Sequence, residues 1–315
     1  MTTSPKPIIT VLGPVTHEQL GITDAHNHVW IEPVSGANPG SPVLDQYASI
    51  LKELVEYQEQ GGSSLLDCQP GGCGRNGNKL IELSMASQVN IIACTGFHRR
   101  KYYAQGFWLW EADAQKVSDY LFAELQDGLT ETIGSPVTCR AGFIKIALEA
   151  TWAKCPHSAL EGAARTAGRT GAVIEIHTEK GALAEKALNY FEDRGVSPHQ
   201  LVFCHMDKRP DISLHQALAS LGVMLEYDTF YRPKYEPERL LWLLIDEMVS
   251  AGYSNRVALA TDMAEVALYH NLGSGPGLKS LPGEIQAKLI KKDYPESVCK
   301  QLLGGNIAQR LAGIN

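Results

Sequence analysis

The chain lacks the features that mark membrane and secreted proteins. No apolar run approaches the ~20 residues that a membrane-spanning helix needs. Residues 1–13 contain one lysine and no long apolar core, so they do not resemble a secretory signal. Basic residues are in the minority, with 28 against 35 acidic ones and a net charge of −7. We therefore expect a small-molecule substrate, and neither nucleic acid nor a membrane as a partner.

Several motifs of common enzyme classes are missing as well. No G-x-G-x-x-G turn follows the first apolar run, which disfavours a doubly wound dinucleotide fold. The glycine-rich segment 70–78 lacks the G-K-[ST] ending of a nucleotide loop and is predicted to be a tight turn braced by Arg75. The absence of G-x-S-x-G weakens a serine-hydrolase interpretation. A nucleophilic Cys68 or Cys73 would need a nearby base and stays a minor alternative.

The seven cysteines are odd in number and follow no paired spacing. Some of them, such as Cys94 and Cys204, lie inside apolar runs. This pattern is typical of buried, reduced thiols, so we expect a cytoplasmic protein.

Short apolar runs rich in β-branched residues alternate with amphipathic segments. The predicted strands cover residues 20–24, 62–68, 90–95, 141–146, 172–176, 201–204, 222–227 and 256–260. The clearest predicted helices cover residues 44–60, 113–132, 179–193 and 236–251. A length of 315 residues would allow two domains. Eight strands alternating with helices instead predict an α/β fold with a single (β/α)8 TIM barrel over residues 1–315, its active-site loops at the C-terminal ends of the strands.

The first predicted strand ends in Asp24-Ala25-His26-Asn27-His28. Side chains alternate along a strand, so His26 and His28 are expected on the same face. At the C-terminal end of a barrel strand both imidazoles would point into the mouth, where barrel enzymes place their sites. Imidazole is a good ligand for zinc and neighbouring metals, although this pair alone is a weak signal.

Other predicted strands also run out at residues that bind metals. His177 follows the strand at 172–176, and His205 follows the strand at 201–204. Asp262 follows the last strand, and the spacings of 28 and 57 residues fit one and two βα units. Either histidine alone would more often be a hydrogen-bonded core residue. Together with His26 and His28, these residues predict a metal site.

Lys145 lies inside the apolar run 141–146. An unpaired buried ammonium is energetically expensive, and burial favours the neutral amine. A neutral amine can add carbon dioxide to become a carbamate, an anionic ligand able to bridge two metals. The alternative is a salt bridge to Glu149 or Glu175.

This pattern of histidines, an aspartate and a lysine at successive predicted strands resembles the amidohydrolase superfamily, and more narrowly the phosphotriesterase-related family. The motifs that carry the likeness are GITDAHNHVW, PGGCGRN, TGFHRRKYY, CHMDKRPD, LGSGPG and GGNIAQRL. They extend the resemblance over about residues 10 to 312.

The resemblance implies a binuclear metal centre and a homodimer. One divalent ion would be held by His26, His28 and Asp262, the other by His177 and His205, with carboxylated Lys145 and a hydroxide between them. Zn²⁺ is the expected ion, and Mn²⁺, Co²⁺ or Fe²⁺ suit the same ligands. Asp262 would accept the proton of the attacking hydroxide. Asp24 would either hydrogen-bond a ligand or cap the turn.

A cationic, aromatic segment follows the third predicted barrel strand. It comprises His98, Arg99, Arg100, Lys101, Tyr102 and Tyr103. At a barrel mouth these residues could bind a carboxylate or phosphate of the substrate, or they could form surface ion pairs. Arg232 and Lys234 are a second candidate for anion contact.

The resemblance therefore predicts a metal-dependent hydrolase of ester bonds. We expect a lactonase acting on a small, anionic, sugar-like lactone. Hydrolysis of organophosphate triesters is the alternative within enzymes. A binding protein on a barrel that has lost its chemistry is the alternative outside them, and the complete set of predicted ligands argues against it.

Overall fold

The computed structural model describes residues 5–314, so residues 1–4 and 315 of the predicted domain lie outside the described part. A short antiparallel hairpin comes first, formed by β1 (Ile8–Thr10) and β2 (Gly13–Val15). The main-chain N–H of Val11, between these strands, donates to the carbonyl oxygen of Ile91 at 2.9 Å. The hairpin thus lies against the start of a barrel strand, at the end opposite the mouth.

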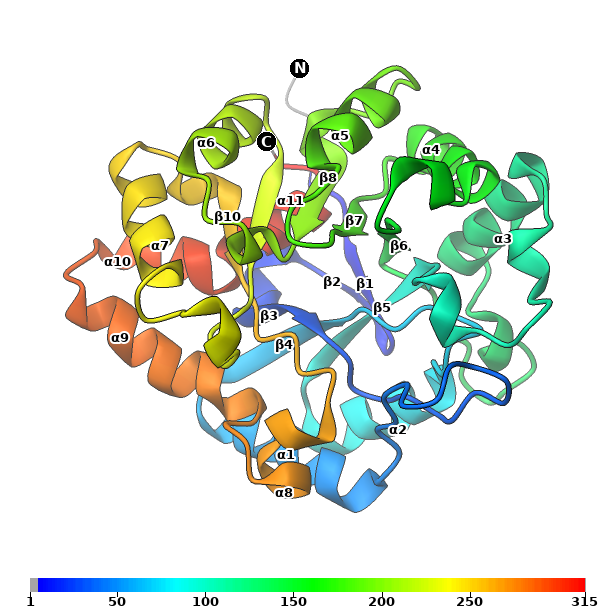
Figure 1. Ribbon diagram of the computed structural model, residues 1–315. Coiled ribbons are helices and arrows are strands. Elements are labelled where there is room, and N and C mark those ends of the chain that lie inside the picture. The colour runs from blue at the N-terminus through cyan, green and yellow to red at the C-terminus, as the bar shows by residue number, and fades with distance from the viewer. Residues whose placement is uncertain (1–4, 315) are drawn as a thin grey trace.

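Eight further strands pair side by side, in parallel and in chain order, to form the barrel in Figure 1. They are β3 (Ile22–Asn27), β4 (Gly62–Asp67), β5 (Asn90–Gly96), β6 (Phe143–Ala147), β7 (Ile174–His177), β8 (Leu201–Cys204), β9 (Met224–Tyr227) and β10 (Val257–Leu259). Each overlaps a predicted strand, so the (β/α)8 prediction is confirmed. The doubly wound alternative is wrong, because such a sheet reverses its strand order at a switch point and this one does not.

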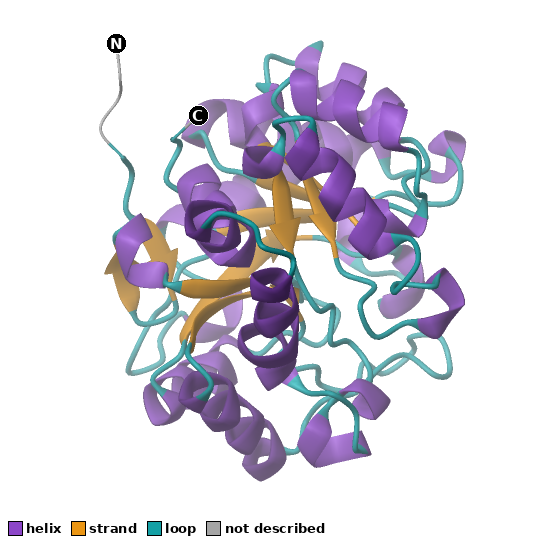
Figure 2. Cartoon of the chain, turned by 90° about the vertical axis from the view of Figure 1, so that its left-hand side faces the viewer, coloured by secondary structure: helices purple, strands orange, loops and turns teal. Residues whose placement is uncertain are grey.

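Helices surround the strands, as Figure 2 shows. They are α1 (Tyr47–Glu59), α2 (Gly77–Ser87), α3 (Ala114–Gln126), α4 (His157–Thr170), α5 (Ala184–Glu192), α6 (Ile212–Ser220), α7 (Leu241–Ser250), α8 (His270–Gly273), α9 (Gln286–Lys291), α10 (Glu296–Lys300) and α11 (Asn306–Leu311). The four predicted helices correspond to α1, α3, α5 and α7. All four begin one to five residues later than predicted, because polar residues of the preceding loops fit the helical period.

Side chains close the seam between the last and first barrel strands. The carboxylate of Asp24 in β3 accepts hydrogen bonds from the main-chain N–H of Thr261 at 3.1 Å and from its hydroxyl at 2.6 Å. The main-chain N–H of Asp262 donates to the carbonyl oxygen of His26 at 3.0 Å. Asp24 therefore joins the two ends of the sheet, and this brings Asp262 beside the first strand.

The alternation of side chains along the strands divides the core in two. Outward residues such as Ile144 and Ile176 pack against the helices, in the larger cluster of buried apolar side chains. Inward residues such as Phe143, Val202 and Met224 fill the barrel interior in a separate cluster. Farther along the same strands the inward positions become polar. The apolar plug at one end thus supports a polar layer beneath the mouth.

Arg75 braces the loop after β4, as the sequence predicted. Its fully buried guanidinium binds Glu124 of α3, with Nη2 2.6 Å from Oε1 and Nη1 2.9 Å from Oε2. It also reaches Glu131 and the carbonyl oxygen of Cys94. These hydrogen bonds tie the β4–α2 unit to the β5–α3 unit and to the segment after α3. In residues 5–314 no helix combines the length and the apolar character that a bilayer crossing requires.

Candidate metal centre

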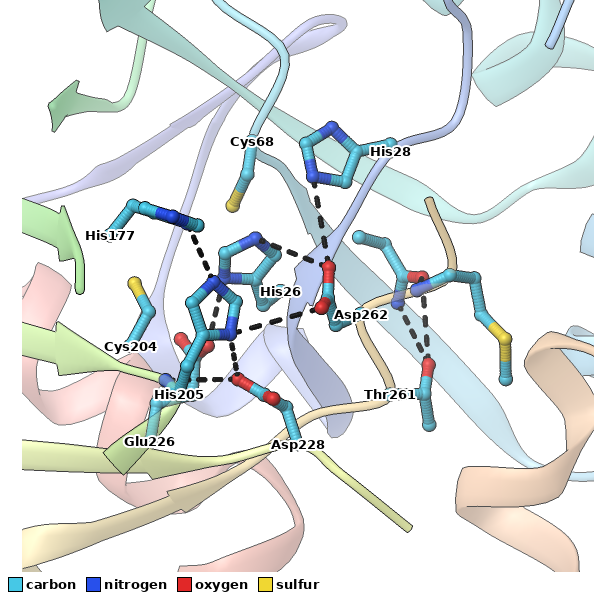
Figure 3. A network of polar contacts seen from close by, with 12 residues as sticks. His26, His28, Cys68, His177, Cys204, His205, Glu226, Asp228, Thr261 and Asp262 are labelled. Carbon is cyan, nitrogen blue, oxygen red and sulfur yellow. Dashed lines mark hydrogen bonds and ion pairs between the residues drawn. The ribbon is translucent and has the colours of Figure 1, made fainter. Parts of the chain in front are cut away.

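The predicted ligands converge at the C-terminal ends of the strands (Figure 3). His26 lies in β3 and His28 just after it, His177 ends β7, and His205 follows β8 directly. Asp262 lies three residues beyond β10. Residues that are up to 236 positions apart in the chain thus meet in one place because the strands are parallel.

The candidate ligand atoms form two groups, one of three residues and one of two. The Nε2 atoms of His26 and His28 lie 3.8 and 3.9 Å from Oδ1 of Asp262. These three residues offer atoms that all lie within 4.8 Å of one another, close enough to hold one ion. In the second group, Nε2 of His205 lies 2.9 Å from Nδ1 of His177. The sequence predicts these same two sets of residues as the ligands of two metal ions.

The nitrogen of each imidazole that does not face the centre meets a protein oxygen. The pairs are Nδ1 of His26 with Oε1 of Glu226 at 2.8 Å, Nδ1 of His28 with Oε1 of Gln69 at 2.7 Å, Nδ1 of His205 with Oδ2 of Asp228 at 2.6 Å, and Nε2 of His177 with Oε1 of Glu179 at 3.3 Å. Metal-binding histidines need such a partner to fix the ring orientation and the tautomer. Each of the four imidazoles therefore has the hydrogen-bond partner that is expected of a metal-binding histidine.

Lys145 is fully buried and its ammonium lies beneath the histidines. Nζ is 2.7 Å from Oε1 of Glu175, 3.1 Å from Sγ of Cys204 and 3.3 Å from Nδ1 of His26. Of the two salt-bridge partners considered from the sequence, Glu175 is the one in contact, whereas Glu149 binds Arg99. The backbones of β5 and β6 are so close here that only glycine fits at position 96, since a Cβ on Gly96 would lie 1.7 Å from the Lys145 carbonyl oxygen.

Burial favours neutral imidazoles at most of the site. It lowers the pKa of His28 to about 3 and that of His177 to about 4, and it holds the pKa of His205 well below the usual range. A neutral imidazole is the form that binds a metal. His26 differs, because the negative field of the adjacent carboxylates of Glu226 and Glu175 outweighs burial and raises its pKa. That field attracts a cation, either a proton or a metal ion.

Asp262 is held ionised. Burial alone would raise the pKa of its carboxyl, but the nearby positive charges of Arg232 and Lys208 outweigh burial and lower it. The carboxylate therefore stays available as a ligand and as a proton acceptor.

Two of the predicted ligands have an unusual backbone. His205 has a φ of 63° and Asp262 a φ of 46°, in the left-handed region that residues other than glycine rarely adopt. Such strain persists only where surrounding contacts over-determine it, and it is concentrated at functional sites. His205 directly follows β8 and Asp262 lies three residues beyond β10, and the side chains of both lie at the mouth.

The centre opens into a cavity of about 350 Å³, within the range of small-molecule sites. The cations in its wall are Lys208, Arg232 and Lys234, and the carboxylates are Glu32, Glu179, Asp262 and Glu265. Arg232 is turned toward the centre, with Nη2 2.9 Å from Oδ2 of Asp262, and Nη1 lies 3.5 Å from Glu265. Lys234 is exposed, and its Nζ lies 5.1 Å from the ring centre of Tyr235.

The segment after β5 contributes to the cavity unevenly. His98 and Tyr102 line it, and their ring centres lie 4.7 Å apart. Tyr103 is buried behind them, and its hydroxyl accepts a hydrogen bond from the main-chain N–H of His98 at 2.9 Å. Arg99 forms ion pairs with Glu149 and Glu179. Arg100 and Lys101 do not line the cavity, and their cationic groups lie over the rings of Trp110 and Tyr102 respectively.

Known proteins resemble this chain over most of its length. The model of the phosphotriesterase family matches residues 6–309. A phospho-furanose lactonase from Mycoplasmopsis synoviae is 30% identical over 287 residues, which are 85% of this chain and 79% of the relative. A phosphotriesterase homology protein from Escherichia coli is 22% identical over 251 residues, covering 79% of this chain and 84% of the relative.

The chain belongs to the phosphotriesterase family. It is a hydrolase of that family, as the sequence motifs predicted. A lactonase from Listeria monocytogenes has the same fold, with a TM-score of 0.90 at 22% identity over 98% of this chain and all of its own. An amidohydrolase from Mycoplasma synoviae superposes with a TM-score of 0.89 at 28% identity, covering 98% of this chain and 93% of the other.

The residues present fit the metal ions that the family pattern implies. Four imidazoles and a carboxylate are ligand types that suit zinc and its neighbours. Beneath them, Glu175, Glu226 and Asp228 each keep one buried carboxylate oxygen without a hydrogen-bond partner. Unpaired buried carboxylate oxygens are costly, and nearby divalent ions would offset their charge.

Several residues that contact the candidate ligands were not predicted from the sequence. Glu226 interrupts the apolar run of β9, which is the same signal that singled out Lys145, and Asp228 directly follows this strand, as His205 follows β8. Glu179 comes two positions after His177, and Lys208 three positions after His205. Asp24 binds Thr261 and the main-chain N–H of His26, so it holds the strand end. The alternative nucleophile Cys73 lines the cavity, but burial raises its pKa to about 12 and keeps it a thiol.

Proposed function

We propose that this protein is a lactonase that hydrolyses a small, anionic, sugar-like lactone. The observation that carries the proposal is the convergence of five potential ligands below a cavity with three cationic side chains in its wall. The similarity to phospho-furanose lactonases from two mycoplasmas, at 30% and 32% identity, supports a lactone as the substrate.

Two divalent ions are proposed at the centre, one with His26, His28 and Asp262, the other with His177 and His205. When bound, such ions supply a nucleophilic hydroxide near neutral pH and polarise the acyl oxygen of the substrate. Zn²⁺ is the expected ion, with Mn²⁺, Co²⁺ and Fe²⁺ as alternatives for the same donors.

Asp262 is proposed as the proton acceptor. Its ionised carboxylate faces the centre through Oδ1, and the guanidinium of Arg232 fixes Oδ2 at 2.9 Å. In lactone hydrolysis, one water adds to the carbonyl carbon and the bond from this carbon to the ring oxygen breaks. Asp262 would take the proton that the nucleophile loses and return it to the ring oxygen, which leaves as a hydroxyl group.

Lys145 is proposed as a carboxylated ligand between the two ions. Its ammonium would first lose one proton, and the neutral amine would then add carbon dioxide and release a second proton, so that a cation becomes an anion. In the metal-free chain the ammonium is paired with Glu175. A carbamate beside Glu175 would be tolerated only with the charge of the ions close by, so carboxylation and metal binding are expected to depend on each other.

The anionic part of the substrate is proposed to lie against Lys208 and Lys234. Both line the cavity, and Lys208 keeps its Nζ 3.9 Å from Oδ2 of Asp262, beyond hydrogen-bond distance. Arg232 is less free for this role because its guanidinium already binds Asp262 and Glu265. A phosphate or a carboxylate would suit these cations.

Membership of the phosphotriesterase family suggests one alternative substrate, an organophosphate triester. The decisive experiment compares metal-loaded protein on sugar lactones with a phosphate, with a carboxylate and without either, and on a phosphotriester. We expect the highest kcat/KM with an anionic lactone. Turnover of the triester alone would overturn the lactonase proposal. Metal binding without turnover of any compound would favour the non-catalytic binding protein.

The cellular setting is part of the proposal. All seven cysteines are free and buried, which suits a reducing cytoplasm. A homodimer is expected from the family resemblance, and sedimentation of the purified protein would test it.

A further inference from the structure

The four candidate histidine ligands are not held in the same way. The oxygens that meet His26, His28 and His205 belong to Glu226, Gln69 and Asp228, which are all buried. The partner of His177 is Glu179, whose side chain is 40% exposed and lines the cavity. His177 is therefore the one of these four rings whose orientation depends on a side chain open to solvent.

The two ring nitrogens of His177 point in different directions, and Glu179 contacts the one that does not face the centre. Nδ1 of His177 lies 2.9 Å from Nε2 of His205, so this nitrogen points to the second metal position. Nε2 points the other way and lies 3.3 Å from Oε1 of Glu179. A ring that donated from Nε2 to Glu179 would keep the lone pair of Nδ1 directed at the centre.

Glu179 is itself anchored by Arg99. Nη1 of Arg99 binds Oε1 of Glu179, and Nε lies 3.3 Å from Oε2 of Glu149. Glu149 also accepts a hydrogen bond from the main-chain N–H of Arg100 at 3.0 Å. The loops after β5, β6 and β7 are thus joined by one arginine and two carboxylates, and only Glu179 of the two carboxylates touches a candidate ligand.

We propose that Glu179 is a positioning residue that holds His177 for the second metal ion and links this ligand to the loop after β5 through Arg99. The inference rests on the proposed metal centre. Outer partners of this kind typically contribute 10- to 100-fold to metal affinity. The cationic segment after β5 thereby acquires a function that is independent of substrate contact.

The test uses the full-length protein with Co²⁺ as the probe and three variants: Glu179→Ala, Glu179→Gln and Glu149→Gln. Affinity is measured by competition with a chelator, and ligand geometry by the visible absorption of bound Co²⁺. Glu179→Ala is expected to weaken one of two Co²⁺ ions by about 10- to 100-fold and to change its spectrum. Glu179→Gln keeps an oxygen that accepts from His177 and should restore most of the affinity. Glu149→Gln, which removes the negative charge that faces Arg99 and alters no contact of His177, should bind like the wild type.

Each outcome decides a different point. If the wild type binds two Co²⁺ ions and Glu179→Ala binds both with unchanged affinity and spectrum, the role of Glu179 is refuted while the metal centre stands. If Glu149→Gln weakens binding as much as Glu179→Ala, the effect comes from loosened loops and the proposal is also refuted. If the wild type binds no Co²⁺, the metal centre fails and the role of Glu179 fails with it.

Discussion

The guanidinium of Arg232 donates to both the main-chain carbonyl oxygen and the carboxylate of Asp262, with Nη2 2.6 Å from the carbonyl oxygen and 2.9 Å from Oδ2. Asp262 has a left-handed backbone. One arginine therefore holds both the backbone and the side chain of the proposed proton acceptor. The sequence suggested Arg232 as a substrate contact, whereas the structure directs it to Asp262.

Replacing Arg232 should consequently affect turnover more than substrate binding. In Arg232→Met the carboxylate of Asp262 loses its fixed orientation, and we expect kcat to fall by about 10- to 100-fold with little change in KM. Steady-state kinetics on an anionic lactone measure this. A large rise in KM at constant kcat would instead show that Arg232 binds the substrate.

Replacing Lys234 should have the opposite effect. Its ammonium is exposed and lines the cavity. Lys234→Met should raise KM for an anionic lactone by about 10-fold, the loss of one charge-assisted hydrogen bond, and leave a neutral lactone unaffected. Lys101→Met is the matched control, because Lys101 lies outside this cavity. Equal effects of the two variants would contradict the proposed location of the anion.

Removing Lys145 should reduce metal content. Lys145→Ala deletes the proposed bridging ligand and leaves Glu175 buried without its cation, so instability could obscure the result. The double variant Lys145→Ala/Glu175→Gln removes both charges and separates the two effects. We expect it to fold and to bind less metal than Glu175→Gln alone, measured by elemental analysis. Native mass spectrometry of the wild type should show added carbon dioxide only when metal is bound.

Arg75 should be a stability residue. Arg75→Met leaves the buried carboxylate of Glu124 unpaired, and breaking such a pair costs about 3–5 kcal/mol. Lys79→Met removes an exposed pair with Glu82, which should cost less than about 1 kcal/mol. Urea unfolding measures both. Similar small losses in the two variants would contradict the structural role of Arg75.

His215 should make the fold sensitive to mild acid. Burial lowers its pKa from 6.5 to about 4, so between these values the unfolded chain binds a proton that the folded chain excludes. The folded state has its full stability above pH 6.5 and loses it as the pH falls toward 4. His215→Asn, which retains a polar atom near the hydroxyl of Tyr227, should lose about 2 kcal/mol less than the wild type between pH 7 and 5. Identical pH slopes in urea unfolding would refute this role.

The barrel and its candidate ligands could be predicted because both depend on local patterns. A strand that is buried on both faces appears as an apolar run, and a polar residue at its end stands out, as His177 and His205 do. Lys145 stands out for the same reason inside a run. These signals need no knowledge of which strands are neighbours.

The partners of the ligands could not be predicted in this way. Asp228 meets His205 only because β8 and β9 are adjacent, and Asp24 meets Thr261 only because the barrel closes. Loop conformation also decides which of several neighbouring cations face the site. Arg99, Arg100 and Lys101 are consecutive, yet none of them is found in the cavity wall, whereas Lys208 and Lys234 are. Such contacts depend on tertiary structure and leave no period in the sequence.

The buried thiols have a practical consequence. Cys68, Cys94 and Cys204 lie inside the barrel, and burial raises the pKa of each well above its usual value. A protonated, enclosed sulfhydryl reacts with alkylating reagents only after the strands separate. The rate at which these cysteines are alkylated therefore measures how often the barrel opens. No engineered cysteine is needed for this measurement.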